Sequence, residues 1–362
     1  MTKGWRTGLL LWALLVALWV PGTWAGAAEV TLGEPVALDV PWGPEMLLTD
    51  GPVPLMDGGW YLTWTVNGAD GTARQWLGLL EGDGTLRWQL CYATIPPGVD
   101  TVTVLPYLSA EGVVVGVYDG PSRQSGQYTV YDLRGKRLYR TPERLIPDED
   151  KDTVLNLGRW QLREWPWHER DGLTGEMQAA RLDGGAVTTL RGLDCCLTTC
   201  VGDALAVLTR DTDGTTLCRL IGPEGTVQTV QAPFALDERD RDILVAAAQD
   251  GAGRLCVLYN HFGRCTCWAL TPGQAAFEAR WTVGADADLF PTDALGVGED
   301  AFLLLDGAGQ MYLLTPSGMA PVTISAGQPL RLVPPTDPGE APRLLVQDDR
   351  GLTLWQVSSV LP

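Results

Sequence analysis

The segment Tyr128-Thr-Val-Tyr-Asp132-Leu-Arg-Gly135-Lys136-Arg-Leu-Tyr139 places two short runs of strand-forming residues on either side of a glycine turn. Valine, threonine and tyrosine favour extended strands, and glycine after polar residues favours a tight turn. The same unit recurs along the chain with its turn glycines 41–51 residues apart. These glycines are Gly84, Gly135, Gly184, Gly225, Gly273 and Gly318. Such a spacing indicates a repeat protein.

A second set of glycines lies earlier in each unit, before a strongly apolar run such as Val113 to Tyr118. Its members are Gly59, Gly112, Gly158, Gly202, Gly253, Gly298 and Gly339. Each unit then holds about four strand-like runs, and antiparallel four-stranded units of roughly 40–50 residues are typical of propeller blades. We predict an all-β chain that forms a single β-propeller of seven four-stranded antiparallel blades, with six or eight as the alternatives.

The two ends of the chain test this prediction. The last unit ends after Leu352 to Ser358 without a fourth strand, whereas Glu29 to Val40 reads as a strand that belongs to no other unit. We therefore expect the N-terminal strand to complete the last blade. Such pairing of the two termini within one sheet would close the ring and remove a free edge.

The third and fourth strands also carry a family resemblance. Leu77-Gly-Leu-Leu-Glu-Gly-Asp-Gly84-Thr-Leu-Arg-Trp88, and more closely Tyr128 to Tyr139, resemble the repeat of quinoprotein-like (PQQ-like) propellers, in the same broad group as WD-repeat-like propellers. In that repeat, Asp-Leu is followed by Gly-Lys and an aromatic residue. Later units depart from it, since Gly273 follows Thr-Pro and Gly318 follows Pro-Ser. The resemblance implies the fold, and we expect no quinone or other cofactor.

The first 27 residues resemble an export signal. Lys3 and Arg6 precede an uncharged, leucine-rich and valine-rich run from Gly8 to Val20, and Ala25-Gly-Ala27 matches the small residues that a signal peptidase accepts. We expect cleavage after Ala27, a propeller domain over residues 28–362, and a secreted or cell-surface location. The alternative is an uncleaved membrane anchor, because the uncharged stretch approaches the ~20 residues that a span needs.

The net charge and a search for catalytic motifs reduce the number of functions that the sequence supports. The chain has 26 Lys and Arg against 44 Asp and Glu, a net charge of −18, which argues against a nucleic-acid partner. We find no nucleophile elbow, zinc-protease helix or phosphate-binding loop. Cys195, Cys196 and Cys200 should lie on an innermost strand. Because the chain has only 2 histidines to serve as further zinc ligands, we expect no metal site.

Cys256 and Cys267 form a disulfide candidate. If Leu255 to Tyr259 and Arg264 to Ala269 flank a loop over Asn260 to Gly263, Tyr259 faces Arg264 and Cys256 faces Cys267. Directly opposed residues in an antiparallel ladder are close enough for a bridge. The alternative is a pair of reduced thiols that fill a blade interior.

The sequence Trp160-Gln-Leu-Arg-Glu-Trp165-Pro-Trp167-His168 offers a candidate ligand site. Trp160 and Trp165 should face opposite sides of a strand, so that one can be buried and the other exposed. Pro166 is expected to end the strand and place Trp167 and His168 in a loop. We take Trp165, Trp167 and His168 as candidate glycan-binding residues. The alternative is that these aromatic residues pack between blades.

The sequence favours a monomeric, non-catalytic propeller that binds a protein, peptide or glycan. The first alternative is a carbohydrate-active enzyme, whose acidic residues would converge at the channel mouth. The second is a cell-surface sensor domain held in the membrane by an uncleaved N-terminal segment. No membrane contact is expected beyond that segment.

Overall fold

A computed structural model describes residues 28–98, 106–118, 126–141, 153–169, 172–191, 194–211, 214–234, 242–285, 290–335 and 340–361. The predicted signal segment lies outside these residues. The ordered elements within them are all β-strands. No helix in these ranges could span a membrane.

Five antiparallel sheets of four strands each follow the chain order. The first two contain β2 (Met46–Pro54), β3 (Trp60–Asn67), β4 (Ala73–Leu80) and β5 (Leu86–Ile95), then β6 (Tyr107–Ser109), β7 (Gly112–Tyr118), β8 (Gly126–Tyr131) and β9 (Arg137–Thr141). The third contains β10 (Thr153–Leu157), β11 (Trp160–Glu169), β12 (Gly172–Arg181) and β13 (Thr188–Arg191). The last two contain β14 (Asp194–Val201), β15 (Ala204–Arg210), β16 (Thr216–Ile221) and β17 (Val227–Gln231), then β18 (Asp242–Gln249), β19 (Leu255–His261), β20 (Arg264–Leu270) and β21 (Glu278–Gly284).

The sixth sheet is mixed and contains eight strands in the order β22-β23-β24-β25-β1-β28-β27-β26. Its strands are β1 (Ala28–Leu38), β22 (Pro291–Gly298), β23 (Ala301–Asp306), β24 (Met311–Thr315), β25 (Gly318–Thr323), β26 (Gln328–Val333), β27 (Arg343–Asp348) and β28 (Gly351–Leu361). The N-terminal strand β1 pairs antiparallel with β28 from Glu29 to Leu38, as the sequence predicts. Its parallel contact with β25, through Ala28 and Glu29, is not predicted.

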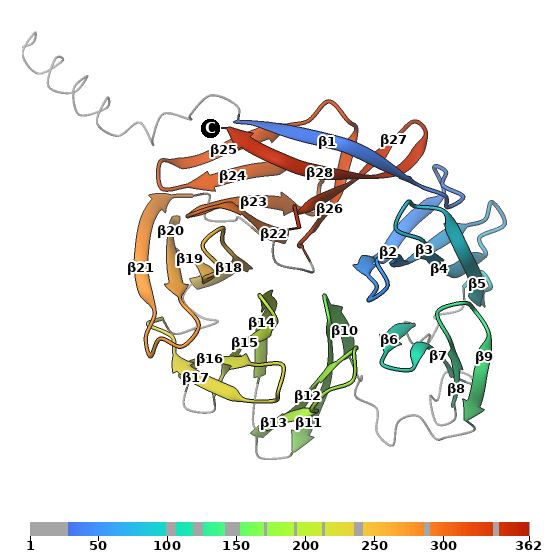
Figure 1. Ribbon diagram of the computed structural model, residues 1–362, viewed down its shortest axis with the longest axis horizontal. Helices are drawn as coiled ribbons and strands as arrows, with labels where there is room; N and C mark the ends of the chain where they lie inside the picture. The colour runs from blue at the N-terminus through green and yellow to red at the C-terminus, as the bar shows by residue number, and fades with distance from the viewer. Residues whose placement is uncertain are drawn as a thin grey trace, which may run out of the picture.

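The sheets follow one another around a ring, with their first strands toward the middle and their fourth strands at the rim (Figure 1). Consecutive first strands contact each other, as β14 contacts β18 and β18 contacts β22. The all-β propeller predicted from the glycine spacing is therefore the observed fold. β14 is one of the inner strands and carries Cys195, Cys196 and Cys200, as expected.

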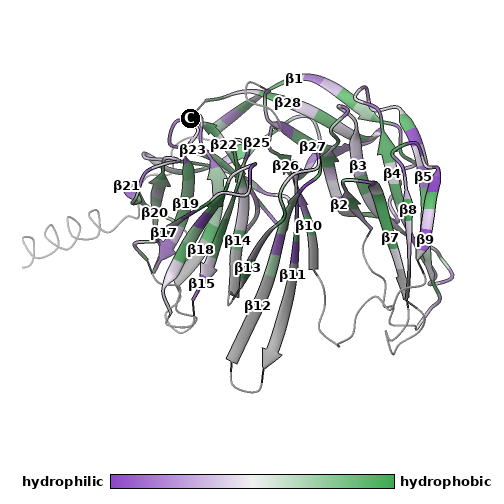
Figure 2. Cartoon of the chain, turned by 60° about the horizontal axis from the view of Figure 1, so that its bottom comes forward, coloured by the Kyte–Doolittle hydropathy of each residue, from purple (hydrophilic) through white to green (hydrophobic). Residues whose placement is uncertain are grey.

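The core lies between neighbouring sheets. Figure 2 shows hydrophobic residues along β4 and β7, while the outer strand β5 carries hydrophilic ones. Tyr61, Leu77 and Leu79 of the first sheet are fully buried in one cluster with Val113 of the next. The two halves of the mixed sheet also pack on each other, since Leu303 of β23 shares a cluster with Leu344 of β27. Burial of such side chains from water supplies most of the folding free energy.

The β19–β20 hairpin differs from the expected register. His261 pairs with Arg264, so the connection is the two residues Phe262 and Gly263 rather than a loop of four. Both residues have positive φ, 49° and 78°, as a type I′ hairpin turn requires. Phenylalanine rarely adopts such a backbone conformation, so residue preferences do not point to this two-residue turn. The observed turn shifts the pairing of every residue in the hairpin.

Phe262 is expected to destabilise this turn, and the Phe262→Asn variant should be more stable by about 1 kcal/mol. Asparagine tolerates the left-handed conformation, and the phenylalanine ring is 63% exposed, so little burial is lost. Urea denaturation measures the difference. Phe262→Ala is the matched control, because it removes the ring but keeps the strained backbone. An equal gain in both variants would contradict the argument from strain.

Strand β11 also runs further than predicted. Pro166 does not end the ladder, because β11 continues to Glu169 and His168 pairs with Leu173 of β12. The described part of β10 pairs with β11 only as far as Glu164. Pro166 therefore lies where β12 is the one described neighbour of β11, and a missing N–H is tolerated at such an edge.

Candidate functional site

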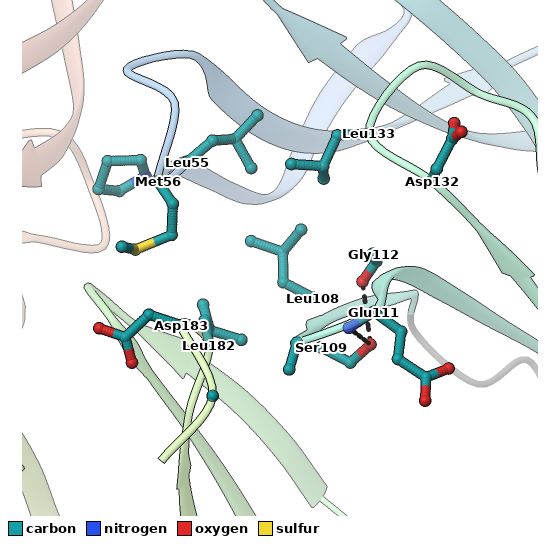
Figure 3. Close-up of a pocket in the computed structure, with 13 residues that line it drawn as sticks. Leu55, Met56, Leu108, Ser109, Glu111, Gly112, Asp132, Leu133, Leu182 and Asp183 are labelled. Atoms are coloured by element: carbon teal, nitrogen blue, oxygen red, sulfur yellow. Dashed lines mark hydrogen bonds between the residues drawn. The ribbon is translucent and has the colours of Figure 1, made fainter.

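A pocket with a volume of about 470 Å³ opens where turns of the first three sheets meet (Figure 3). Two of these turns, β2–β3 and β6–β7, join first and second strands, and the other two, β8–β9 and β12–β13, join third and fourth strands. In an antiparallel meander these two kinds of turn lie at the same end of the sheet. The pocket therefore lies on one face of the propeller.

Leucine side chains form the floor of the pocket. Leu55 and Leu108 are buried in the cluster between the first two sheets. Leu133 and Leu182 are half-buried and pack against the same cluster. Met56 stands beside them at the rim and is 48% exposed. The floor is thus an extension of the hydrophobic core that reaches solvent, which is typical of ligand sites.

A tight turn between β8 and β9 holds one side of this floor. In the β8–β9 turn, Asp132 Oδ1 accepts hydrogen bonds from the backbone N–H groups of Arg134 and Lys136, both at 2.9 Å. Gly135 has φ +79° and lies against the ring of Trp88, which leaves no room for a side chain. This geometry fixes Leu133 at the tip of the turn, facing the pocket.

Arg87 of β5 ties three turns together behind the pocket. Its guanidinium contacts Asp57 Oδ2 at 2.7 Å in the β2–β3 turn and Glu81 Oε2 at 2.7 Å in the β4–β5 turn. It also donates to the Leu133 carbonyl oxygen at 3.3 Å in the next sheet. Partial burial opposes ionisation of Asp57, but the hydrogen bond from Arg87 holds the pKa of this carboxyl below its ordinary value. The pocket wall is therefore preorganised by charge-assisted bonds.

The charged side chains that line the pocket are all acidic: Glu111, Asp132 and Asp183. Arg181 pairs with Asp183 through both carboxylate oxygens, with Nε donating to Oδ1 at 2.7 Å. Glu111 accepts a hydrogen bond from the Tyr139 hydroxyl. Among the described residues, Glu111 and Asp132 form no ion pair. The rim thus keeps uncompensated negative charge on the side of these two residues.

A second polar cluster lies on three inner strands. Asp293 of β22 accepts from Arg331 of β26 at 3.2 Å and from the Leu332 N–H at 3.3 Å. Asp50 of β2 lies near the same arginine. Burial raises the pKa of both carboxyl groups, against the opposing effects of Arg331 and of backbone N–H donors. Two acids with raised pKa values, on the inner strands at either side of β26, form a candidate reactive site.

Removing the charge of Asp50 is expected to stabilise the fold near neutral pH. Its pKa is raised in the folded state, so its contribution is fully present below the unfolded pKa and is lost as pH rises through the folded pKa. The Asp50→Asn variant should be more stable than the parent at pH 8, on the order of 1 kcal/mol. This advantage should fade as the pH falls through the raised pKa of Asp50, because the parent then takes up a proton and loses the buried charge.

Melting temperatures of parent and variant across this pH range measure the effect. Asp293→Asn is the control, because Asp293 also has a raised pKa but is ion-paired with Arg331. Loss of the Asp293 carboxylate leaves the half-buried guanidinium of Arg331 without its partner. The gain in stability at pH 8 should therefore be smaller than for Asp50→Asn, or reversed. A pH-independent advantage for Asp50→Asn would contradict the assignment.

The backbone of the predicted ligand residues Trp165, Trp167 and His168 lies in β11, but their side chains are outside the part of the chain that the structure describes. In the β11–β12 ladder, Trp165 pairs with Glu176, Trp167 with Thr174 and His168 with Leu173. Trp160 is buried, with 1% of its surface exposed. The predicted division between the two faces of the strand stays a prediction, because the side chain of Trp165 lies outside the described part. The described residues that line the pocket belong to other segments of the chain.

The two cysteines of the disulfide candidate are not directly opposed. Cys256 faces Ala269 and Cys267 faces Leu258, so the pair is diagonal on one face of the sheet. Both are fully buried as reduced thiols. A hydrogen bond to Cys267, together with burial, raises the pKa of Cys256 well above its ordinary value. The register prediction is wrong by two residues, and the disulfide stays a prediction.

Sequence reasoning did not identify the pocket. Asp132 and Leu133 belong to the quoted repeat motif, whose pattern predicts two strands and a turn but no ligand site. Leu182 and Asp183 hold comparable places before the turn glycine of the next unit. The available signal was therefore a leucine and an acid beside the third-to-fourth turn in two consecutive units.

No model of a known protein family matches the chain, and no curated protein matches its sequence. Solved structures share its fold at low identity. The β-propeller domain of the trilobed protease from Pyrococcus furiosus is 11% identical, with TM-score 0.44 over 87% of this chain and 96% of that chain. BBS1N, in complex with ARL6DN, is 12% identical, with TM-score 0.41 over 86% and 97% of the two chains. Apo AztD from Citrobacter koseri is 10% identical, with TM-score 0.42 over 86% and 83%. The chain is similar to these propellers in fold alone.

Proposed function

We propose that the chain is an exported, non-catalytic propeller that binds a protein, peptide or glycan ligand at the pocket of Leu55, Leu108, Leu133 and Leu182. The observation that carries this proposal is the apolar floor, which is open to solvent and held by preorganised turns. Preorganised concave apolar surfaces with a few polar groups are typical of binding sites. Export is supported by the charge and apolar pattern of residues 1–27.

Thermal shift on residues 28–362 tests this function, because a ligand that binds only the folded state raises the melting temperature. The panel contains defined glycans and mixed octapeptides. Met56→Lys places a charge at the pocket rim, whereas Leu47→Lys changes another exposed apolar residue outside the pocket. A ligand-induced shift should be lost in the first variant and kept in the second. Equal shifts in both variants would exclude this pocket as the site.

A hydrolase acting on carbohydrates is the second candidate function. Its support is the pair of Asp50 and Asp293, since an acid with raised pKa can serve as a proton donor. Hydrolysis of nitrophenyl glycosides by the parent chain, abolished in both Asp50→Asn and Asp293→Asn, would favour this function. Activity retained in both variants, or absent from the parent, would exclude these two residues as its catalytic pair.

The aromatic residues of β11 give an alternative glycan site. Trp165 and Trp167 have the same strand parity and so belong to one face of β11, while His168 belongs to the other. A glycan-induced shift that is lost in Trp167→Ala but kept in Met56→Lys would move the ligand site to β11. Loss only in Met56→Lys would leave these residues without a binding role.

The proposal also includes the number of blades, the cleavage of the signal and one disulfide. The mixed sheet acts as two blades, because its two halves pack on each other, and this gives seven blades. The resemblance of Tyr128 to Tyr139 to the PQQ-like repeat supports blades of that type. Signal cleavage leaves Ala28, whose side chain is buried, at the start of β1. Cys256 and Cys267 share one sheet face, and their thiols are close enough to hydrogen-bond, so an extracytoplasmic thiol oxidant would take up their two electrons and two protons and join them in a disulfide. Mass spectrometry of the purified chain, digested without reductant, tests both the terminus and the bridge.

A further inference from the structure

We propose that the occupant of the pocket is an extended peptide segment of a partner protein, with an apolar side chain next to a lysine or arginine. This inference rests on the proposed binding function and names its ligand class. The lining of the pocket, the position of its uncompensated acids and the charge of the whole chain all favour this ligand.

The lining favours a peptide over a glycan. Leu55, Leu108, Leu133 and Leu182 offer an aliphatic floor, and none of the lining residues that the structure describes is aromatic. Sugar rings are commonly held by stacking on aromatic faces, which this pocket does not provide. An aliphatic or aromatic side chain of a peptide would instead be desolvated against the leucines. The volume of about 470 Å³ is within the range of sites that hold small ligand groups.

The acids define where the cation binds. Asp183 is already neutralised by Arg181, and Asp57 behind the wall is neutralised by Arg87. Glu111 and Asp132 have no such ion pair among the described residues. Figure 3 shows Glu111 and Asp132 on one side of the leucine floor, with Met56 and Asp183 on the other. A bound segment would therefore place its cation between Glu111 and Asp132, and its apolar side chain over the floor toward Met56.

The charge of the chain supports the same partner. A net charge of −18 attracts cationic segments and accelerates their encounter with the pocket. It also opposes the approach of a second copy of this chain, which carries the same charge. Because the Debye length shortens from about 10 Å at 0.1 M salt to about 3 Å at 1 M, contacts between exposed charges weaken, and the peptide should bind less tightly as salt is raised over this range.

Fluorescence polarisation with labelled octapeptides tests the proposal. The probe has Leu-Lys at its centre within a serine and glycine background, and the two control peptides have Leu-Glu or Ser-Lys there. The Leu-Lys peptide should bind at least about 10-fold more tightly than either control, the effect of one good charge contact or one buried aliphatic group. Equal affinity for all three peptides would overturn the proposal.

Matched variants locate the contact. Asp132→Asn and Glu111→Gln keep an oxygen acceptor for the turn N–H groups and for Tyr139, so the fold should be retained. Each should weaken the Leu-Lys peptide about 3-fold to 10-fold. Asp349→Asn removes an exposed acid from the β27–β28 turn, which joins a second strand to a third, and should leave the affinity unchanged. Equal losses in all three variants would show only a general charge effect and overturn the proposal.

The outcomes separate the ligand class from the binding function. A glycan-induced thermal shift that is abolished by Met56→Lys, without binding of the Leu-Lys peptide, would retain the pocket function and overturn the peptide ligand. Leu-Lys binding that survives Met56→Lys would overturn both. Concentration-dependent self-association in analytical ultracentrifugation that is lost in Met56→Lys would identify a second copy as the occupant and overturn the partner proposed here.

Discussion

The Gly84→Ala variant is expected to lose about 3 kcal/mol or more of its free energy of unfolding. Gly84 has φ +86°, a conformation that costs an L-residue energy by itself. An added Cβ would also lie under 3.0 Å from the Ala37 carbonyl oxygen. Backbone atoms cannot rotate away as a flexible side chain can, so the neighbouring strand β1 would have to move.

This position matters because β1 completes the mixed sheet. The Asp39 N–H donates to the Gly84 carbonyl oxygen at 2.9 Å, which joins the end of β1 to the β4–β5 turn of the first sheet. Leu38, one residue earlier, is buried in the cluster between the mixed sheet and the first sheet. Displacement of β1 would therefore disturb the contact through which the N-terminal segment closes the ring.

Gly273→Ala is the matched control. Gly273 has nearly the same backbone conformation, with φ +87°, but no atom lies within 4 Å of its added Cβ. Its loss should be about 1–2 kcal/mol, the cost of the left-handed backbone alone. Urea denaturation of both variants measures the difference, which isolates the clash with β1. Equal losses of unfolding free energy would mean that β1 moves aside at little cost and that its closure of the ring contributes little to stability.

The strands and their order could be predicted from the sequence because their determinants are local. Turn glycines such as Gly84 and Gly135 have positive φ, and the apolar runs between them are the strands of the sheets. The missing strand of the last unit was equally predictable, since β1 is strand material with no other partner. A repeat makes each local pattern support the next, so errors at single turns do not change the fold.

The remaining features depend on contacts that local patterns do not specify. The Phe262-Gly263 turn adopts a conformation that phenylalanine disfavours. The free energy that offsets this cost must come from the β19–β20 ladder that the turn permits. The parallel contact of β1 with β25 arises from how the two halves of the mixed sheet meet. The pocket is a similar case, because Leu55, Leu108 and Leu182 come from three different sheets. No periodicity along the chain links these residues.

Trp160→Ala is expected to lower the free energy of unfolding by about 3–5 kcal/mol, the usual cost of truncating a buried tryptophan. Trp160 is 1% exposed and packs with Leu205 and Val207 in the cluster between the third and fourth sheets. Its Nε1 donates to the Asp203 carbonyl oxygen at 3.1 Å, across the same junction. The guanidinium of Arg181 lies 5.6 Å from its ring centroid.

Trp160→Phe separates packing from hydrogen bonding at this junction. The phenyl ring keeps most of the contact with Leu205 but cannot donate to Asp203, which should cost about 1–2 kcal/mol. Urea denaturation followed by circular dichroism measures both variants. If Trp160→Phe cost as much as Trp160→Ala, the hydrogen bond to the β14–β15 turn would be the main link between the two sheets. If neither lost more than about 1 kcal/mol, the sheets would be held together elsewhere, and the aromatic sequence around Trp160 would need a role other than packing.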